Sequence, residues 1–145
     1  MKKICLFIVL LFLMILFIFS KGQKNKLFPI DLKRKGNSVT YFVEIADTPE
    51  KAQIGLMYRK TMPRNQGMLF VFPHPSIIRM WMKNTYIPLD MIFFNAQNQI
   101  ICLRENIHPL DEKNIISCPY PASKVLELNA GEIKSENIRL GDTLY

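Results

Sequence analysis

The sequence predicts a mainly β domain, a compact β-sandwich or jelly-roll-like barrel with one or two short peripheral helices, preceded by an N-terminal hydrophobic helix. Three observations predict this fold. Short apolar segments typical of strands recur after residue 38, turn residues separate them at close spacing, and an unbroken apolar run stands near the N-terminus. A length of 145 residues is typical of one domain.

The first 22 residues have the layout of a signal peptide or a membrane anchor. Met1, Lys2 and Lys3 form a basic start, residues 4–19 are apolar, and small residues at 20 and 22 permit cleavage after Gly22. Uncleaved, residues 4–19 would make about 24 Å of helix, short of the roughly 30 Å hydrocarbon core. The sequence leaves both alternatives open. Either way we expect an exported domain, periplasmic or anchored in the cytoplasmic membrane with the domain outside the cytoplasm.

The positive charge lies in the leader and in residues 23–38, which we interpret as a basic linker before a single β-rich domain at 39–145. Residues 1–38 contain eight Lys or Arg side chains against Asp31 alone, whereas residues 39–145 contain eleven basic and eleven acidic side chains. The net charge of +7 therefore belongs to the N-terminal part. Nucleic-acid binding needs a basic face on the folded domain, so we expect no nucleic-acid partner.

The domain is predicted to begin with a strand and a helix. Residues 39–45 alternate apolar and polar side chains with the period of a half-buried strand. Thr48 suits a helix N-cap and Pro49 suits the first helical position, so a helix is expected to continue through Tyr58.

Further apolar runs predict the remaining strands, separated by turns. The run at 68–72 is expected to end at the prolines that follow it, and Pro88 indicates an edge or a bulge. Residues 106–122 are predicted to form a long ordered loop, 131–137 a short helix, and the chain to end in a strand. The other predicted strands are 77–82, the run ending at 94, 99–105 and 124–129.

Several long motifs occur in a fixed order through the domain. They are VEIADTPE (43–50), GLM (55–57), GMLFVF (67–72), WMKNT (81–85) with IPLD (87–90), and VLELNAG (125–131). This series closely resembles the family known as domain of unknown function 192, over nearly all of residues 42–143. The resemblance implies a compact, mostly β fold of jelly-roll-like shape and, in many members, an export signal. No biochemical activity is established for that family as a whole.

The segment from 81 to 90 carries the densest set of functional side chains. Trp81, Lys83, Asn84, Thr85 and Asp90 lie within ten residues at a strand–turn–strand corner. They would form a pocket wall where Trp81 stacks on a ligand and Lys83 and Asn84 contact an anionic or hydroxyl-rich group. The alternative is structural: Asn84 and Thr85 bond the turn backbone, Asp90 pairs with Lys83, and Trp81 is core.

Three other charged residues complete the candidate pocket. Glu105 and Glu127 end or interrupt apolar strands, and Glu105 facing the same cavity as Asp90 would resemble the paired carboxylates of glycoside hydrolysis. Arg59 follows the predicted helix, where it either stabilises the helix C-terminus or contacts an anion. Convergence of such side chains on one open pocket separates a binding or catalytic role from a structural one.

The cysteine and histidine pattern indicates no metal site. Cys102 and Cys118 are an even pair in an exported domain, which suggests a disulfide, with two free thiols as the alternative. His74 and His108 each precede a proline and lack ligand spacing. We therefore expect neither a metal nor a cofactor.

The sequence favours an exported or membrane-tethered, non-enzymatic module that binds a small polar ligand or an envelope partner. One alternative is a small hydrolase-like enzyme that uses Asp90, Glu105 or Glu127, with Lys83 as electrostatic partner. Another is a structural envelope-associated protein. A perturbed carboxyl pKa in a pocket would favour catalysis over simple binding.

Overall fold

The computed structural model describes residues 26–34 and 36–145, and in this part the prediction of a mainly β fold with short helices is confirmed. The predicted N-terminal leader lies outside the described residues. No helix within them is long and apolar enough to cross a bilayer. The strands are β1 (Phe28–Arg34), β2 (Asn37–Ala46), β3 (Gln66–Ser76), β4 (Arg79–Met80), β5 (Leu89–Phe94), β6 (Ile100–Ile107), β7 (Ile116–Ser117), β8 (Ala122–Asn129) and β9 (Thr143–Leu144), and the helices are α2 (Pro49–Ile54) and α3 (Glu132–Ser135).

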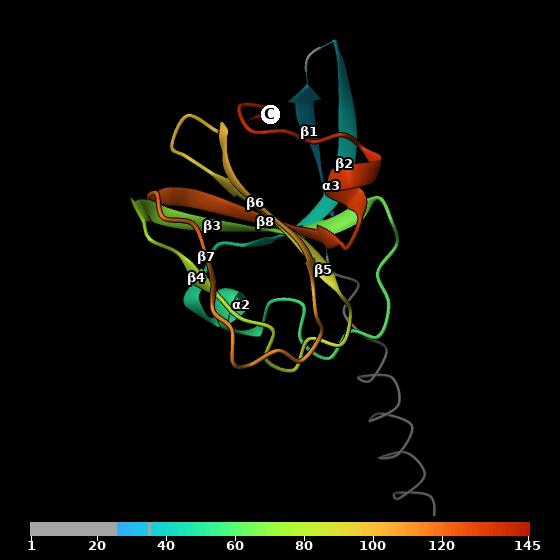
Figure 1. Cartoon of the computed structure of the whole chain (residues 1–145), viewed down its shortest axis with the longest axis vertical. Helices are drawn as coiled ribbons and strands as arrows, with labels where there is room; N and C mark the ends of the chain where they lie inside the picture. The colour runs from blue at the N-terminus through green and yellow to red at the C-terminus, as the bar shows by residue number, and fades with distance from the viewer. Residues whose placement is uncertain (1–25, 35) are drawn as a thin grey trace, which may run out of the picture.

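One curled sheet organises the described part of the chain. Seven strands follow the order β6-β5-β8-β3-β2-β1-β9, and β4 pairs with β7 in a separate two-stranded sheet. The sheet curls into a half-barrel (Figure 1), and a bridge between Gln99 and Thr143 brings its two ends together. The strands pair antiparallel except β2 and β3, which run parallel and are joined by α2 as a crossover. The two packed sheets of a sandwich are thus replaced by one sheet bent upon itself.

Both faces of the central strands are buried, because different elements cover each face. All six residues of β5 are buried. Met91 and Phe93 belong to a first core, which α2, β4, β7 and the adjoining loops cover; Ile92 and Phe94 belong to a second core, which β1, β2, β9 and α3 cover (Figure 1). The alternation of side chains along each strand supplies both cores at once.

The predicted boundary between linker and domain is wrong. Residues 28–34 form β1, which pairs with β2 in the register Ile30 to Tyr41 and Leu32 to Val39. Ile30 and Leu32 are buried in the second core, Asp31 and Lys33 are exposed, and Arg34 is partly buried. Asp31 and Lys33 are therefore the outward residues of a strand, so the domain begins at 28 and not at 39.

Two other boundaries differ from the prediction because of tertiary pairing. β3 continues through its prolines to Ser76, with a register shift between Val71 and Ser76 that leaves the exposed prolines outside the regular ladder. β4 is only two residues long, and its partner β7 lies within the predicted loop at 106–122. The predicted helices are confirmed, although α2 ends at Ile54, ahead of Tyr58.

Candidate functional site

A row of four side chains crosses the sheet on the face that α2 covers. Glu44 of β2 pairs with Met68 of β3, which pairs with Glu127 of β8, which in turn pairs with Met91 of β5. Two carboxyl groups therefore lie on the same face as the first core. Two pockets open on this face, and Ile54 and Gly55 at the end of α2 line both of them.

Two glycines allow the close packing around this row. A Cβ atom at Gly67 would lie 2.4 Å from the carbonyl oxygen of Glu127, so only glycine lets β3 approach β8 at this point. Gly55 has a positive φ of 50°, and a Cβ atom there would lie 3.1 Å from Cζ of Phe70. The turn after α2 can thus pack directly on the sheet between the two pockets.

The smaller pocket has a volume of about 150 Å³ and contains Glu127. This side chain is only 4% exposed, and none of the described residues forms a hydrogen bond with its carboxyl group. Burial raises the pKa of Glu127 to about 8, against a smaller lowering by the positive charge of Arg59. At neutral pH the group is therefore mostly a protonated carboxylic acid. Other lining residues include Leu56, Phe70, Phe72, Arg79, Trp81 and Thr85.

The larger pocket, about 620 Å³, contains an ion pair between Arg59 and Glu44. The guanidinium donates two hydrogen bonds to the carboxylate, with Nη2 to Oε2 at 2.7 Å. The anion that Arg59 contacts is thus a carboxylate of its own chain. Because the charge of Arg59 also acts on Glu127, this arginine links the electrostatics of both pockets.

The 81–85 turn places Trp81 at the surface. Its side chain is 44% exposed and lines the smaller pocket, and Nζ of Lys83 lies 5.4 Å from the centre of its ring. The Thr85 hydroxyl donates to the carbonyl of Lys83 at 3.2 Å. Asn84 donates its side-chain amide to the Tyr58 hydroxyl at 2.9 Å, and Tyr58 N–H donates to the Asn84 carbonyl at 2.8 Å. We call this pair of bonds the Tyr58–Asn84 clasp.

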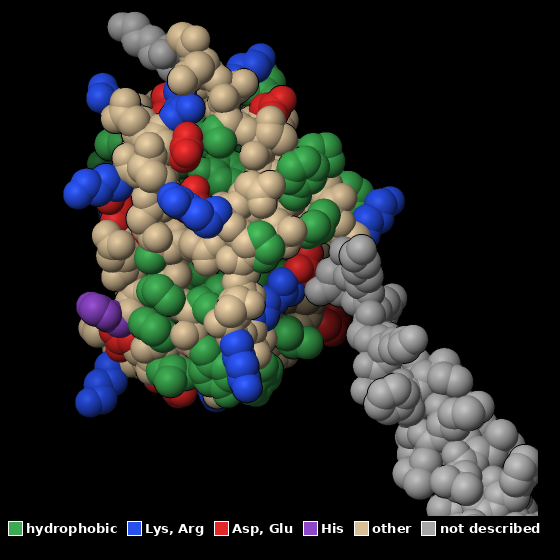
Figure 2. Space-filling model, turned by 90° about the vertical axis from the view of Figure 1, so that its right-hand side faces the viewer, with side chains coloured by type: hydrophobic (Ala, Val, Ile, Leu, Met, Phe, Trp, Pro, Cys, Tyr) green, Lys and Arg blue, Asp and Glu red, His purple; other side chains and the backbone are tan. Residues whose placement is uncertain are grey.

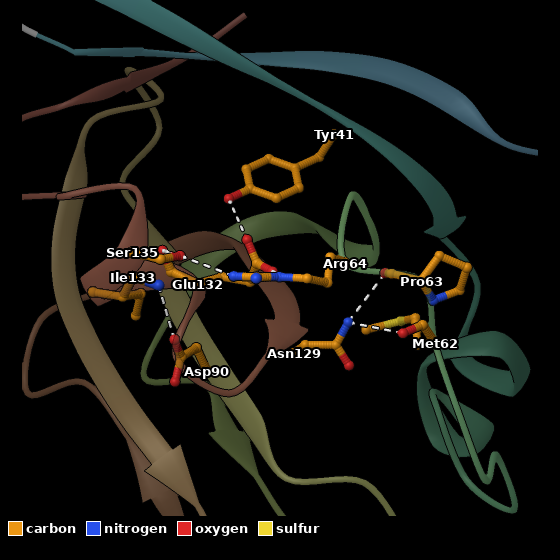
Figure 3. A network of polar contacts seen from close by, with 9 residues as sticks. All are labelled: Tyr41, Met62, Pro63, Arg64, Asp90, Asn129, Glu132, Ile133 and Ser135. Atoms are coloured by element: carbon orange, nitrogen blue, oxygen red, sulfur yellow. Dashed lines mark hydrogen bonds and ion pairs between the residues drawn. The ribbon is translucent and has the colours of Figure 1, made fainter.

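Asp90 has a different environment. It is completely buried and accepts hydrogen bonds from the backbone N–H groups of Asn106 at 2.8 Å and Ile133 at 2.9 Å, the second at the start of α3 (Figure 3). Its carboxylate is therefore bonded to backbone rather than to Lys83. Glu105 is exposed on β6.

The structure brings together only part of the predicted site. Trp81, Thr85 and Glu127 line the smaller pocket, and Arg59 lines the larger one. Asp90 and Glu105 line neither pocket, so the arrangement of two catalytic carboxylates facing one cavity does not occur in these pockets.

Cys102 of β6 and Cys118, just after β7, form a disulfide in this structure, with 5.9 Å between their Cα atoms. Both are buried in the first core. Of the two alternatives left open by the sequence, the structure contains the bonded one.

Comparisons with known proteins agree with this architecture. The profile of the family DUF192, described as Uncharacterized ACR, matches residues 30–145. The chain belongs to the DUF192 family. A crystal structure from Sinorhizobium meliloti 1021, described as a candidate transcription regulator, is similar to this DUF192 chain at 38% identity, with a TM-score of 0.81 over 86% of this chain and 97% of the other.

A second similar crystal structure comes from Novosphingobium aromaticivorans DSM 12444 and is described as a protein of unknown function. It is 28% identical, with a TM-score of 0.81 over 87% of this chain and 89% of the other. No curated protein matches this chain.

Sequence reasoning about this DUF192 domain missed Glu44, Gly55 and Arg79. Glu44 was counted as an outward residue of its strand, but the end of β2 is covered on both faces because α2 folds back over it. Arg79 stands in an apolar run and shows no periodic signal. The only sequence signal for Gly55 was its place in the GLM motif (55–57). Gly55 and Arg59 both line the larger pocket.

A second buried polar cluster lies on the opposite face of the sheet. The Tyr41 hydroxyl donates to Glu132 at 3.3 Å, and Nε of Arg64 donates to the same carboxylate at 3.2 Å (Figure 3). Burial raises the pKa of Tyr41, and the charge of Glu132 raises it further. These hydrogen bonds tie α3 to β2 through Glu132, which is buried, while the side chain of Arg64 is largely exposed.

Proposed function

We propose that this DUF192 domain is a binding module that holds a small polar ligand in the smaller pocket. One observation carries the proposal: the Glu127 carboxyl lines this pocket on a side chain only 4% exposed, and none of the described residues forms a hydrogen bond with it. Folding removes most of the water that would hydrogen-bond this carboxyl, while the pocket leaves it accessible to a small molecule. A ligand that hydrogen-bonds Glu127 would replace the lost water.

The other walls of the pocket suit a ligand with a polar end and an apolar body. Thr85 supplies a hydroxyl, Arg79 a cation, and Phe70, Phe72 and Trp81 supply aromatic surface. The volume of about 150 Å³ is below the roughly 300–1,000 Å³ of most ligand sites. The pocket therefore accepts a very small molecule, or one end of a larger molecule that continues over the rim.

The location is part of the same proposal. We place the domain outside the cytoplasm, exported by its leader or tethered through residues 4–19. The disulfide between Cys102 and Cys118 supports this placement, because such bonds persist in oxidising compartments and are rare in reducing ones. N-terminal sequencing of the expressed protein tests the two forms, since a chain that starts at Gln23 excludes the anchor. Digestion of the domain by added protease after the outer barrier alone is permeabilised, with the cytoplasmic membrane intact, would support an extracytoplasmic position, and exclusive recovery in the cytosol would contradict it.

The description of the Sinorhizobium meliloti relative raises the possibility of a role in transcription. Residues 28–145 of this chain carry fourteen basic and twelve acidic side chains, so the domain has only a small part of the positive excess that usually attracts nucleic acid. A small-ligand site fits the charge of the domain better.

A thermal-shift screen of the full chain in detergent micelles tests binding against sugars, nucleotides, metal ions and envelope fragments. We expect a ligand that raises the melting temperature of the wild type and not that of Trp81→Ala. Glu105→Gln is the matched control, because Glu105 is exposed and lines neither pocket. Folded protein that responds to none of these compounds would contradict the proposal and leave a structural role in the envelope.

A hydrolase-like enzyme is the second candidate, and one observation favours it. The pKa of about 8 at Glu127 is near the operating pH, as a general acid requires. Glu127→Gln separates the two functions: a binding module keeps its ligand affinity in this variant, whereas an enzyme keeps binding and loses turnover.

A further inference from the structure

Three exposed aromatic side chains stand beside the smaller pocket. Trp81, at 44% exposure, lines it directly, and Tyr58 and Tyr86, at 61% and 43%, each follow a lining residue in the chain. The two tyrosine rings meet edge to face with 6.2 Å between their centres. Hydrophobic side chains gather in the lower half of the face shown in Figure 2, the half that holds α2 and the loops beneath the sheet in Figure 1. We call Trp81, Tyr58 and Tyr86 the aromatic rim.

The backbone holds the aromatic rim in place at an energetic cost. Tyr58 has a positive φ of 64°, in the left-handed region that bulky residues avoid, and Asn84 has a positive φ of 52°, which asparagine tolerates well. The Tyr58–Asn84 clasp holds the strained tyrosine through a backbone and a side-chain hydrogen bond. Strain retained beside a pocket indicates a surface whose shape is fixed before a ligand arrives.

The polar groups at this place determine what chemistry the rim and pocket accept together. A protonated Glu127 offers one O–H donor and one carbonyl acceptor, and Thr85 offers a hydroxyl. Arg59 is paired with the Glu44 carboxylate, whereas Arg79 lines the smaller pocket itself from β4. The positive charge of Arg79 disfavours a cationic ligand. A neutral ligand rich in hydroxyl or amide groups matches the remaining donors and acceptors.

We propose that the ligand is a neutral carbohydrate, with one sugar ring over the aromatic rim and a hydroxyl or acetamido substituent in the smaller pocket, hydrogen-bonded to Glu127. A sugar ring presents C–H groups that pack on aromatic faces, while its substituents carry the donors and acceptors that a buried carboxylic acid requires. This inference rests on the proposed function, because it names the class of ligand for the same pocket.

Trp81 is the single tryptophan of the chain, so its fluorescence reports directly on this site. The full chain in detergent micelles is titrated with glucose, N-acetylglucosamine, and the β-1,4-linked dimers of each. We expect a saturable change in emission for at least one sugar. Affinity should fall by at least about tenfold in Tyr86→Ala, since truncated aromatic anchors commonly cost more than 1 kcal/mol of binding. Tyr145→Ala is the control, because Tyr145 is also an exposed tyrosine but lies at the C-terminus, where its ring contacts Lys33 of β1.

Two substitutions at Glu127 test its part in binding. Glu127→Gln keeps a donor and an acceptor and should keep the affinity, whereas Glu127→Leu removes both and should lower it by at least about tenfold. Wild-type affinity should also fall as pH rises through about 8, where the carboxyl loses its donor, and the affinity of Glu127→Gln should not. Circular dichroism of each variant establishes that it is folded.

The outcomes separate this inference from the proposal on which it rests. Saturable binding of butylamine, acetate or a neutral tetrapeptide, with no response to any sugar, would overturn the carbohydrate and keep the pocket. Sugar binding that survives Tyr86→Ala and Glu127→Leu would overturn the assignment of the sugar to this site. No response to these probes, together with a negative thermal-shift screen, would overturn both.

Discussion

Arg59 and Glu44 form an ion pair with two hydrogen bonds at the edge of the first core. Each terminal nitrogen of the guanidinium donates one hydrogen bond to the same carboxylate. Their side chains are 27% and 14% exposed, so water screens the pair only in part. The geometry fixes Arg59 against β2, and from there its charge lowers the pKa of the buried Glu127. A single arginine thus joins the segment after α2 to the sheet and influences the candidate binding group.

We predict a measurable coupling energy between Arg59 and Glu44. A double-mutant cycle with Arg59→Met and Glu44→Gln should give about 1–3 kcal/mol in urea unfolding, because two-point charged hydrogen bonds are strong when partly buried. The pair formed by Lys51 and Asp47, exposed by more than half, is the control and should show clearly weaker coupling, because solvent screens it. Equal coupling in the two cycles would contradict the role assigned to Arg59.

We predict that Glu127 makes the protein less stable as pH rises. The native state holds a proton at Glu127 up to about pH 8, while the unfolded chain releases it near 4.5. Between these values the unfolded state binds fewer protons, so stability falls by up to about 1.4 kcal/mol per pH unit from this group. Glu127→Gln should remove this slope and should be more stable than the wild type at pH 8. Urea unfolding at pH 5, 6.5 and 8 measures it, and Glu105→Gln, which should leave the slope unchanged, is the control.

Patterns within one strand were sufficient for the class of fold and for the position of most elements, because side-chain alternation and turn residues are local signals. Pairing is not local. The charged residues around Ile30 and Leu32 concealed β1, whose two inward side chains become meaningful only beside β2. The choice between one curled sheet and two packed sheets likewise depends on pairings distant in sequence, such as β3 with β8.

The candidate site was also predictable only in part from the sequence. Trp81 and Glu127 were identified because a tryptophan near a turn and a glutamate inside an apolar strand are conspicuous in sequence. Asp90 was equally conspicuous, yet its hydrogen bonds go to backbone N–H groups of two segments that follow it by 16 and 43 residues. The sequence carries the residue type, but only the folded chain shows which partners a carboxylate has.

We predict that Asp90 stabilises the fold by anchoring α3. Asp90→Asn leaves one buried N–H donor facing an amide group instead of a carboxylate oxygen, which should cost about 2–3 kcal/mol in urea unfolding. Asp111 also accepts two backbone hydrogen bonds, but in an exposed loop where water replaces lost bonds, so Asp111→Asn should destabilise the fold much less than Asp90→Asn. Unchanged stability in Asp90→Asn with lost ligand binding would instead assign Asp90 to the binding site.

We predict that the disulfide between Cys102 and Cys118 contributes about 3 kcal/mol to stability, because it closes a loop with a sequence separation of 16 and so restricts the unfolded chain. Both cysteines are buried in the first core, so replacement by alanine adds a small packing loss to this figure. The double variant Cys102→Ala/Cys118→Ala should therefore unfold at a lower urea concentration than the oxidised wild type.

The reduced wild type is the control, because it keeps both sulfur atoms and lacks only the bond between them. If oxidised and reduced wild type unfold at the same urea concentration, the bond does not stabilise the fold. If alkylation under denaturing, non-reducing conditions labels both cysteines of protein purified from its native compartment, the bond is absent there.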